Sequence, residues 1–174
     1  PDSVFQYFVN FTRDGVLTTS PDQDSTPDQW EIINDTALHL WGNNWKNTPM
    51  TVTINADGTQ ILEATMKAQN TAEIYAIGFT TTQGIGTNNT NYHLAGTQNW
   101  GITPDKPYTN YDQWQKIQAI LDDTTLQGTW NYWVFGNDDD GGSDGGADNT
   151  GSTGNVTYKN VRIRAYTNPE PVVE

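Results

Sequence analysis

The sequence contains no cysteine, only eight lysines and arginines, and no apolar run long enough to span a bilayer. Without cysteine, neither a disulfide framework nor a thiolate metal site is possible. The lack of cysteine does not distinguish a cytoplasmic from an extracellular protein. Phosphate binding needs a basic patch, so a net charge of −13 argues against nucleic acid as a partner. Anionic membranes are disfavoured for the same reason, and we expect no membrane insertion.

The length of 174 residues suits one domain with a real core. Twenty aromatic residues, seven of them tryptophan, supply bulk for that core, while abundant Thr and Asn favour strands and turns over helices. We expect a single domain over residues 1–168. We interpret the Pro- and Glu-rich residues 169–174 as the start of a linker, and the chain as a monomeric module of a longer protein.

Alternation of apolar and polar residues predicts many short strands, most clearly at residues 61–68. The expected strands are residues 3–12, 37–41, 50–54, 61–68, 73–79, 92–95, 114–120, 129–135 and 156–166. Residues 14–28 are expected to form a loop, and only residues 122–127 could form a helical turn. Nine or ten strands at this spacing predict an all-β antiparallel sandwich of jelly-roll type.

An acidic, glycine-rich segment, NDDDGGSDGGADNTGSTG (residues 137–154), follows the β-forming run TWNYWVF. Calcium takes six to eight oxygen ligands, and glycines let a loop turn several carboxylates inward. Because the segment starts where a hydrophobic strand stops, we predict a Ca²⁺ site rather than a solvated acidic loop. The expected ligands are Asp138, Asp139 and Asp140 first, and Asp144 and Asp148 next.

The segment matches neither of two common calcium motifs. Counting twelve residues from Asp138 or Asp140 gives Asn149 or Gly151 instead of the glutamate of an EF-hand. Nor do large aliphatic residues follow the aspartates, as they do in RTX nonapeptides. Weak acidic calcium sites fill where calcium is millimolar, which predicts an extracellular location. A second acidic cluster, Asp22, Asp24 and Asp28, is either another site or a solvated loop.

The order of several segments resembles a family of β-sandwich modules found in secreted proteins of largely marine bacteria. The resemblance covers residues 38–163 and rests on LxLWGNNWK, ILEATMKA, AEIYAIGF, YHLAGTQNWGI, VFGNDDD and VTYKNVRI. One branch of the family looks like carbohydrate-binding modules of polysaccharide-degrading enzymes. The other is similar to the peptide-binding domain of giant RTX adhesins. Both branches imply a calcium-associated recognition module without catalysis.

Strong acidity, the lack of cysteine and the Pro/Glu tail favour the adhesin branch. Our first hypothesis is therefore an adhesion module at the bacterial cell surface that binds peptide chain ends or surface ligands of a host cell. The alternatives are a carbohydrate-binding module and a structural spacer. Calcium would either order the acidic segment or, with open coordination positions, take oxygens from the peptide or glycan ligand.

Aromatic residues would form the contact surface for either ligand, because sugar faces and apolar side chains pack on flat rings. We expect ligand contacts from Trp100, Gln98 and Asn99, which follow Gly96 at the end of a short strand, and from Asp139 and Asp140. The remaining aromatic candidates are Trp41, Trp45, Tyr108, Tyr111, Trp130 and Trp133. Each could instead belong to the core, and for Trp133 the core is favoured.

Catalytic patterns are weak. Glu63 and Glu73 are the best carboxylate pair for a glycosidase, but we expect both to face solvent or brace a turn. His39 and His93 are too separated for a zinc site. Tyr92 and His93 should point to opposite faces of a strand, which excludes the Tyr/His pair of a sandwich-type lyase. We therefore predict that the protein is not an enzyme.

Overall fold

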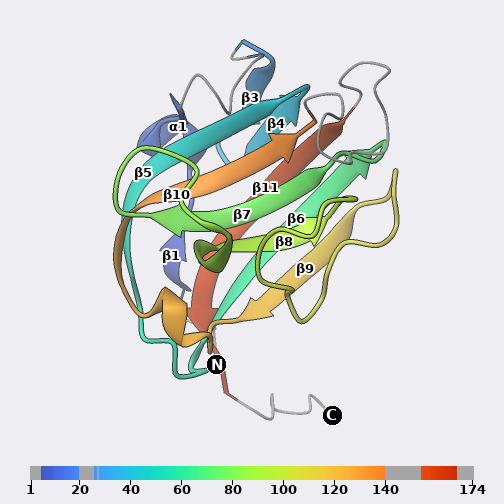
Figure 1. The fold of residues 1–174 in the computed structure, drawn as a ribbon. Helices are drawn as coiled ribbons and strands as arrows, with labels where there is room; N and C mark the ends of the chain where they lie inside the picture. The colour runs from blue at the N-terminus through green and yellow to red at the C-terminus, as the bar shows by residue number, and fades with distance from the viewer. Residues whose placement is uncertain (1–4, 20–25, 27, 140–153, 168–174) are drawn as a thin grey trace, which may run out of the picture.

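The computed structural model describes residues 5–19, 26, 28–139 and 154–167. These residues form eleven strands in two antiparallel sheets that pack face to face (Figure 1), which confirms the predicted all-β sandwich. Several predicted features lie outside the described residues: Asp22, Asp24, Asp140, Asp144, Asp148 and the linker at 169–174. Among the helices of the described residues, none is long and apolar enough to cross a membrane.

Sheet A has the hydrogen-bonded order β3-β4-β11-β6-β9, with β1 also pairing with β11. Its strands are β1 (Phe5–Phe8), β3 (Trp30–Asn34), β4 (Ala37–Trp41), β6 (Gln60–Gln69), β9 (Gln115–Ile120) and β11 (Asn155–Ala165). Sheet B has the order β2-β5-β10-β7-β8. Its strands are β2 (Leu17–Thr18), β5 (Asn44–Ile54), β7 (Ile74–Thr80), β8 (Asn91–Ala95) and β10 (Gly128–Asp138).

The structure differs from the expected elements near the N-terminus. A short helix, α1 (Phe11–Asp14), replaces the end of the expected first strand, because the Asn10 side chain accepts a hydrogen bond from Arg13 N at 2.8 Å and caps it. Strand β3 was not expected. Strand β5 begins at Asn44 instead of residue 50, since it pairs with β10 along its whole length. The expected turn at 122–127 is present as η3 (Thr124–Leu126), and η2 (Asn88–Thr90) precedes β8.

The core lies between the sheets and follows the predicted alternation. The inward residues of β6 are buried, including Leu62, Met66 and Ala68. Trp133 and Phe135 of β10 point into the same core, with their rings stacked at 6.5 Å. Ile61 and Glu63, on either side of Leu62 in β6, therefore point to the outer face of sheet A, away from sheet B.

The outer face of sheet B is covered by the chain itself. Trp45 lies over Gly136, and with Ile74 and Val134 it forms a second apolar cluster there. The segment 81–90 between β7 and β8 crosses this face in front of β5 and β10 (Figure 1). Asn47 holds it, donating to Gly84 O at 2.9 Å and accepting from Gly84 N at 2.8 Å. The hollows described below lie instead on the outer face of sheet A.

Candidate functional site

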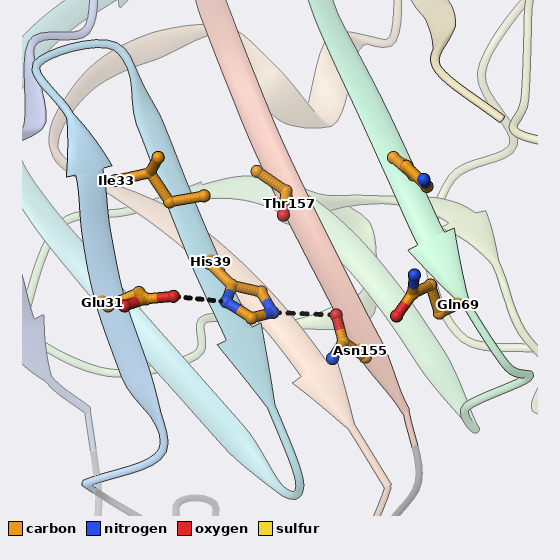
Figure 2. Close-up of a pocket in the computed structure, with 7 residues that line it drawn as sticks. Glu31, Ile33, His39, Gln69, Asn155 and Thr157 are labelled. Atoms are coloured by element: carbon orange, nitrogen blue, oxygen red, sulfur yellow. Dashed lines mark hydrogen bonds and ion pairs between the residues drawn. The ribbon is translucent and has the colours of Figure 1, made fainter. Parts of the chain in front are cut away.

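A hollow of about 330 Å³ lies on the outer face of sheet A, where β3, β4, β11 and β6 run side by side (Figure 2). Strand alternation points one residue in two from each strand onto this face. The lining residues are Glu31, Ile33, His39, Lys67, Gln69, Asn155 and Thr157. Apart from Ile33, all of them carry hydrogen-bonding or charged groups, so the hollow suits a polar ligand.

A row of hydrogen bonds fixes the centre of the hollow. His39 Nδ1 lies 3.0 Å from Glu31 Oε1, and His39 Nε2 lies 2.8 Å from Asn155 Oδ1. The pairing of β3 with β4 sets Glu31 opposite His39, and the pairing of β4 with β11 sets Thr157 opposite His39. Figure 2 shows Gln69 on the neighbouring strand beside Asn155, its partner in the register of β6 and β11. The imidazole ring is thus held between two oxygen atoms.

Two indole rings lie on the same face of sheet A, one of them beside His39. Trp41 is half-buried, faces Asn155 across the β4–β11 pairing, and has its ring centroid 4.8 Å from that of His39. Trp114, directly before β9, is 48% exposed, and Lys159 Nζ lies 3.8 Å from its ring centroid. Flat apolar rings beside planar polar groups can contact both the ring face and the hydroxyls of a sugar.

A charged cluster surrounds Glu63 farther along the same face. The carboxylate is 1% exposed and accepts hydrogen bonds from Arg162 at 2.8 and 3.0 Å and from Arg164 at 2.9 Å. Lys116 Nζ lies 2.9 Å away and Gln118 donates at 2.6 Å. Burial raises the pKa of Glu63, but the hydrogen bonds from Arg164, Lys116, Gln118 and Arg162 together outweigh it and lower the pKa to about 2.

This cluster corrects the expectation for the two glutamates. Neither faces solvent, because Glu63 and Glu73 are 1% and 3% exposed. Glu63 belongs to sheet A, whereas Glu73 directly precedes β7 of sheet B, so the two carboxylates do not face each other across a cleft. As predicted, Tyr92 is buried in the core and His93 points to the opposite face of β8.

Two of the predicted calcium ligands, Asp138 and Asp139, belong to the described residues, and they lie at the end of β10. Asp138 is its last residue, half-buried, and the carboxylate of Asp139, 3% exposed, accepts a hydrogen bond from Gly154 N. Asn137 donates to the carbonyl of the same Gly154. The two ends of the acidic segment are therefore joined across residues 140–153.

Two buried amide oxygens lie at the base of this segment. Asn44 and Asn137 are fully buried and pair directly across β5 and β10. Neither Oδ1 atom has a hydrogen-bond donor among the residues that the structure describes. Such atoms match the oxygen ligands that calcium takes. Within residues 5–19, 26, 28–139 and 154–167, however, no group of three or more His, Asp or Glu could hold a metal ion.

The predicted ligand-contact segment lies at the same end of sheet B. Gln98 N donates to Glu73 O, and Glu73 N donates to Asp138 O, which brings Gln98 and Asp138 together. Asn99 is exposed. Trp100 is half-buried and packs edge-on against Trp45, with ring centroids 5.6 Å apart. Ligand binding by Gln98, Asn99, Trp100 and Asp139 stays a prediction.

Most remaining aromatic candidates belong to the core. Trp133 and Tyr108 are buried, and Tyr111 and Trp130 pack against the core. Asp28 is exposed. Sequence reasoning missed Glu31, Asn155 and Gln69, which are far apart in the chain. Only the pairing of β3 with β4 and of β11 with β4 and β6 places them beside His39.

Neither a protein-family model nor a curated protein matches the sequence. Several solved structures match the chain at low similarity. A protein crystallised with a xylogluco-oligosaccharide is 11% identical, with a TM-score of 0.47 over 94% of this chain and 37% of that one. The family 30 carbohydrate-binding module of a Clostridium thermocellum cellulosomal cellulase is 12% identical, with a TM-score of 0.39 over 82% of this chain and 88% of the module.

The N-terminal CBM22-1 and GH10 modules of a Clostridium thermocellum endo-1,4-β-D-xylanase, crystallised with xylohexaose, are 11% identical to this chain. Their TM-score is 0.39 over 99% of this chain and 29% of theirs. This chain thus spans 37% of the first of these structures and a smaller share of the xylanase. At these identities and TM-scores, the likenesses assign no function.

Proposed function

We propose that this chain is a non-catalytic module that binds glycans on the outer face of sheet A, outside the cell and within a longer protein. The observation that carries the proposal is the hollow in which Glu31, His39 and Asn155 form a fixed polar row beside Trp41. Sugar recognition needs such planar hydrogen-bonding groups next to a flat ring. Oligosaccharides also accompany two structural neighbours, but the proposal rests on the face itself.

The adhesin hypothesis, which the composition of the sequence favoured, has no support among the described residues. Its peptide ligand would need an ion with open coordination positions in the acidic segment. The glycan hypothesis was the alternative in the sequence interpretation, with ligand contacts expected at Gln98, Asn99 and Trp100. The glycan-binding face is instead proposed at Glu31, His39 and Asn155. The one carboxylate pair weighed from the sequence, Glu63 with Glu73, is divided between the two sheets and so does not form a glycosidase pair.

Calcium remains part of the proposal. The buried oxygens of Asn44 and Asn137, together with Asp138 and Asp139, supply part of an oxygen ligand set. Asn155, which holds His39, directly follows Gly154 at the end of the acidic segment. Calcium bound there would order the segment and so support the hollow, without contacting the glycan.

The test measures retention of the protein on a polysaccharide array and on a library of C-terminal peptides, both in 1 mM calcium. We expect the polysaccharide array to retain the protein, and a His39→Ala, Asn155→Ala double variant to bind at least tenfold more weakly. Gln127→Ala, an exposed amide outside the face, is the matched control and should bind normally. Retention on peptides alone would restore the adhesin hypothesis. Binding to neither library, with calcium still raising the melting temperature, would favour the structural spacer.

A further inference from the structure

The cations of this acidic protein gather on one face. The net charge is −13, and only eight residues are lysine or arginine. Five of these eight lie on the outer face of sheet A: Lys67, Lys116, Lys159, Arg162 and Arg164. A sixth, Lys106, pairs through an isolated β-bridge with Gln118 of the edge strand β9. The other two are Arg13 in α1 and Lys46 in β5.

The hollows of this face are lined by five lysines and arginines but by fewer carboxylates. Three line its hollows: Glu63 is surrounded by three cations, Asp105 Oδ2 accepts from Ile120 N at 2.6 Å, and Glu31 contacts His39. Lys67 and Lys106, in contrast, have no ion-pair partner in the part of the chain that the structure describes. The face therefore offers positive charge that its own carboxylates leave uncompensated.

A second hollow on this face, of about 460 Å³, combines charge with an apolar floor. Ile61 and Ile120 pair directly across β6 and β9 to form the floor, and Lys106 and Arg164 also line it. Arg164 is held in place by Glu63 at 2.9 Å and by its donation to Ala165 O at 3.0 Å. A guanidinium fixed in this way loses little side-chain entropy when it pairs with an anion.

We propose that the glycan bound by this face is an anionic polysaccharide, whose carboxylate or sulfate groups pair with Lys67, Lys106 and Arg164. The inference rests on the proposed function and adds the chemical class of the ligand. A sugar ring with an anionic substituent matches a hollow that has an apolar floor and two cations, Lys106 and Arg164, against the single carboxylate of Asp105. Salt screens charges beyond about 8 Å at physiological ionic strength, so the acidic remainder of the molecule repels such a polymer weakly at this face.

Calorimetric titration with polymers matched in backbone and different in charge tests the inference. The anionic probes are carboxymethylcellulose and dextran sulfate, and the neutral probes are hydroxyethylcellulose and dextran, all in 1 mM calcium. We expect at least one anionic probe to bind tenfold or more tightly than its neutral counterpart. Binding should weaken between 50 and 500 mM NaCl.

Paired variants locate the effect. Lys67→Gln with Lys106→Gln should weaken binding of the anionic probe about tenfold, roughly threefold for each charge removed, since Lys67 is half-buried and Lys106 exposed. Arg13→Gln removes one positive charge from α1 and should leave the affinity unchanged. Equal binding of charged and neutral probes, or an equal loss in Arg13→Gln, would overturn the inference while the glycan-binding function stands. If the protein binds neither the four polymers nor the polysaccharide array, both the inference and the proposed glycan-binding function are overturned.

Discussion

Glu63 shows how a single buried carboxylate can organise a binding face. It accepts hydrogen bonds from two arginines of β11 and from Gln118 of β9, so it ties three neighbouring strands together. Burying a charge is costly unless it is paired and hydrogen-bonded. Here three cations surround one carboxylate. Arg162 and Arg164 are therefore held in place, and the cluster keeps a net positive charge.

The Glu63→Gln substitution should destabilise the protein by about 3 kcal/mol at pH 7, because it leaves Lys116, Arg162 and Arg164 facing one another without a counter-ion. The pKa of Glu63 is lowered from 4.5 to about 2 in the folded state. A lowered carboxyl pKa stabilises the folded state fully above the unfolded pKa, and this contribution is lost as the pH falls from about 4.5 towards 2. Urea unfolding at pH 7 and pH 3 measures both effects.

The exposed Glu31→Gln is the control for this prediction, since surface changes usually alter stability by less than about 0.5 kcal/mol. The difference between Glu63→Gln and the unsubstituted protein should shrink at pH 3. A difference that stays constant with pH would mean that Glu63 contributes through packing and not through its charge.

Gly136 leaves room for Trp45 on the outer face of sheet B. A Cβ atom at this position would lie 2.5 to 2.8 Å from three ring atoms of Trp45. Gly136→Ala should therefore destabilise the protein by about 1–3 kcal/mol through overpacking, measured by urea unfolding. In a Trp45→Phe background the clash is smaller, so the same substitution should cost less. Additive effects of the two substitutions would contradict the predicted contact.

At the scale of elements, Asn47 anchors the segment that covers sheet B. Its side chain bonds both backbone groups of Gly84 and donates to Trp133 O at 3.1 Å. Asn47→Ala removes all three hydrogen bonds, at a cost of about 1–3 kcal/mol for buried polar groups left without partners. Hydrogen exchange should accelerate in residues 81–90 and change little in β4 and β11. Asn131→Ala removes one exposed bond to Thr81 O and should have a smaller effect.

Strands with a clear period of two could be predicted from the sequence. The alternation at residues 61–68 gives β6 within one residue at each end, and residues 37–41 coincide with β4. Strand β3 was missed because its sequence, WEIIN, carries only a partial alternation. Helix α1 depends on one capping contact of Asn10, which a propensity argument cannot distinguish from a continuing strand.

The candidate site was less accessible to sequence reasoning, because it depends on register. Glu31, His39 and Asn155 meet only because β4 lies between β3 and β11 in sheet A. Nothing in the three local sequences states that order. The acidic segment, in contrast, was visible as a cluster, and the structure places its first residues, Asp138 and Asp139, at the end of a strand as expected.

At the scale of the molecule, the two outer faces differ. The chain covers the outer face of sheet B with its own segment 81–90 (Figure 1). Sheet A instead presents hollows, indole rings and most of the cations. The acidic segment joins the two sheets, because Asp138 ends β10 in sheet B and Asn155 begins β11 in sheet A. An ion bound by this segment would therefore stabilise the sandwich as a whole.

Calcium should consequently raise the melting temperature of the intact chain. For a weak site with a dissociation constant of about 0.1 mM, binding of 1 mM calcium to the folded state alone contributes about 1.4 kcal/mol, or about 3–6 °C for a protein of this size. Scanning calorimetry in 1 mM calcium and in EDTA measures the shift. Asp138→Asn with Asp139→Asn keeps the hydrogen-bond acceptors but removes two charges, and should abolish most of the shift. Asp57→Asn, in an exposed turn, should retain it. An unchanged melting temperature in the unsubstituted protein would exclude calcium from the segment, and a shift that survives in the double variant would place the ion elsewhere.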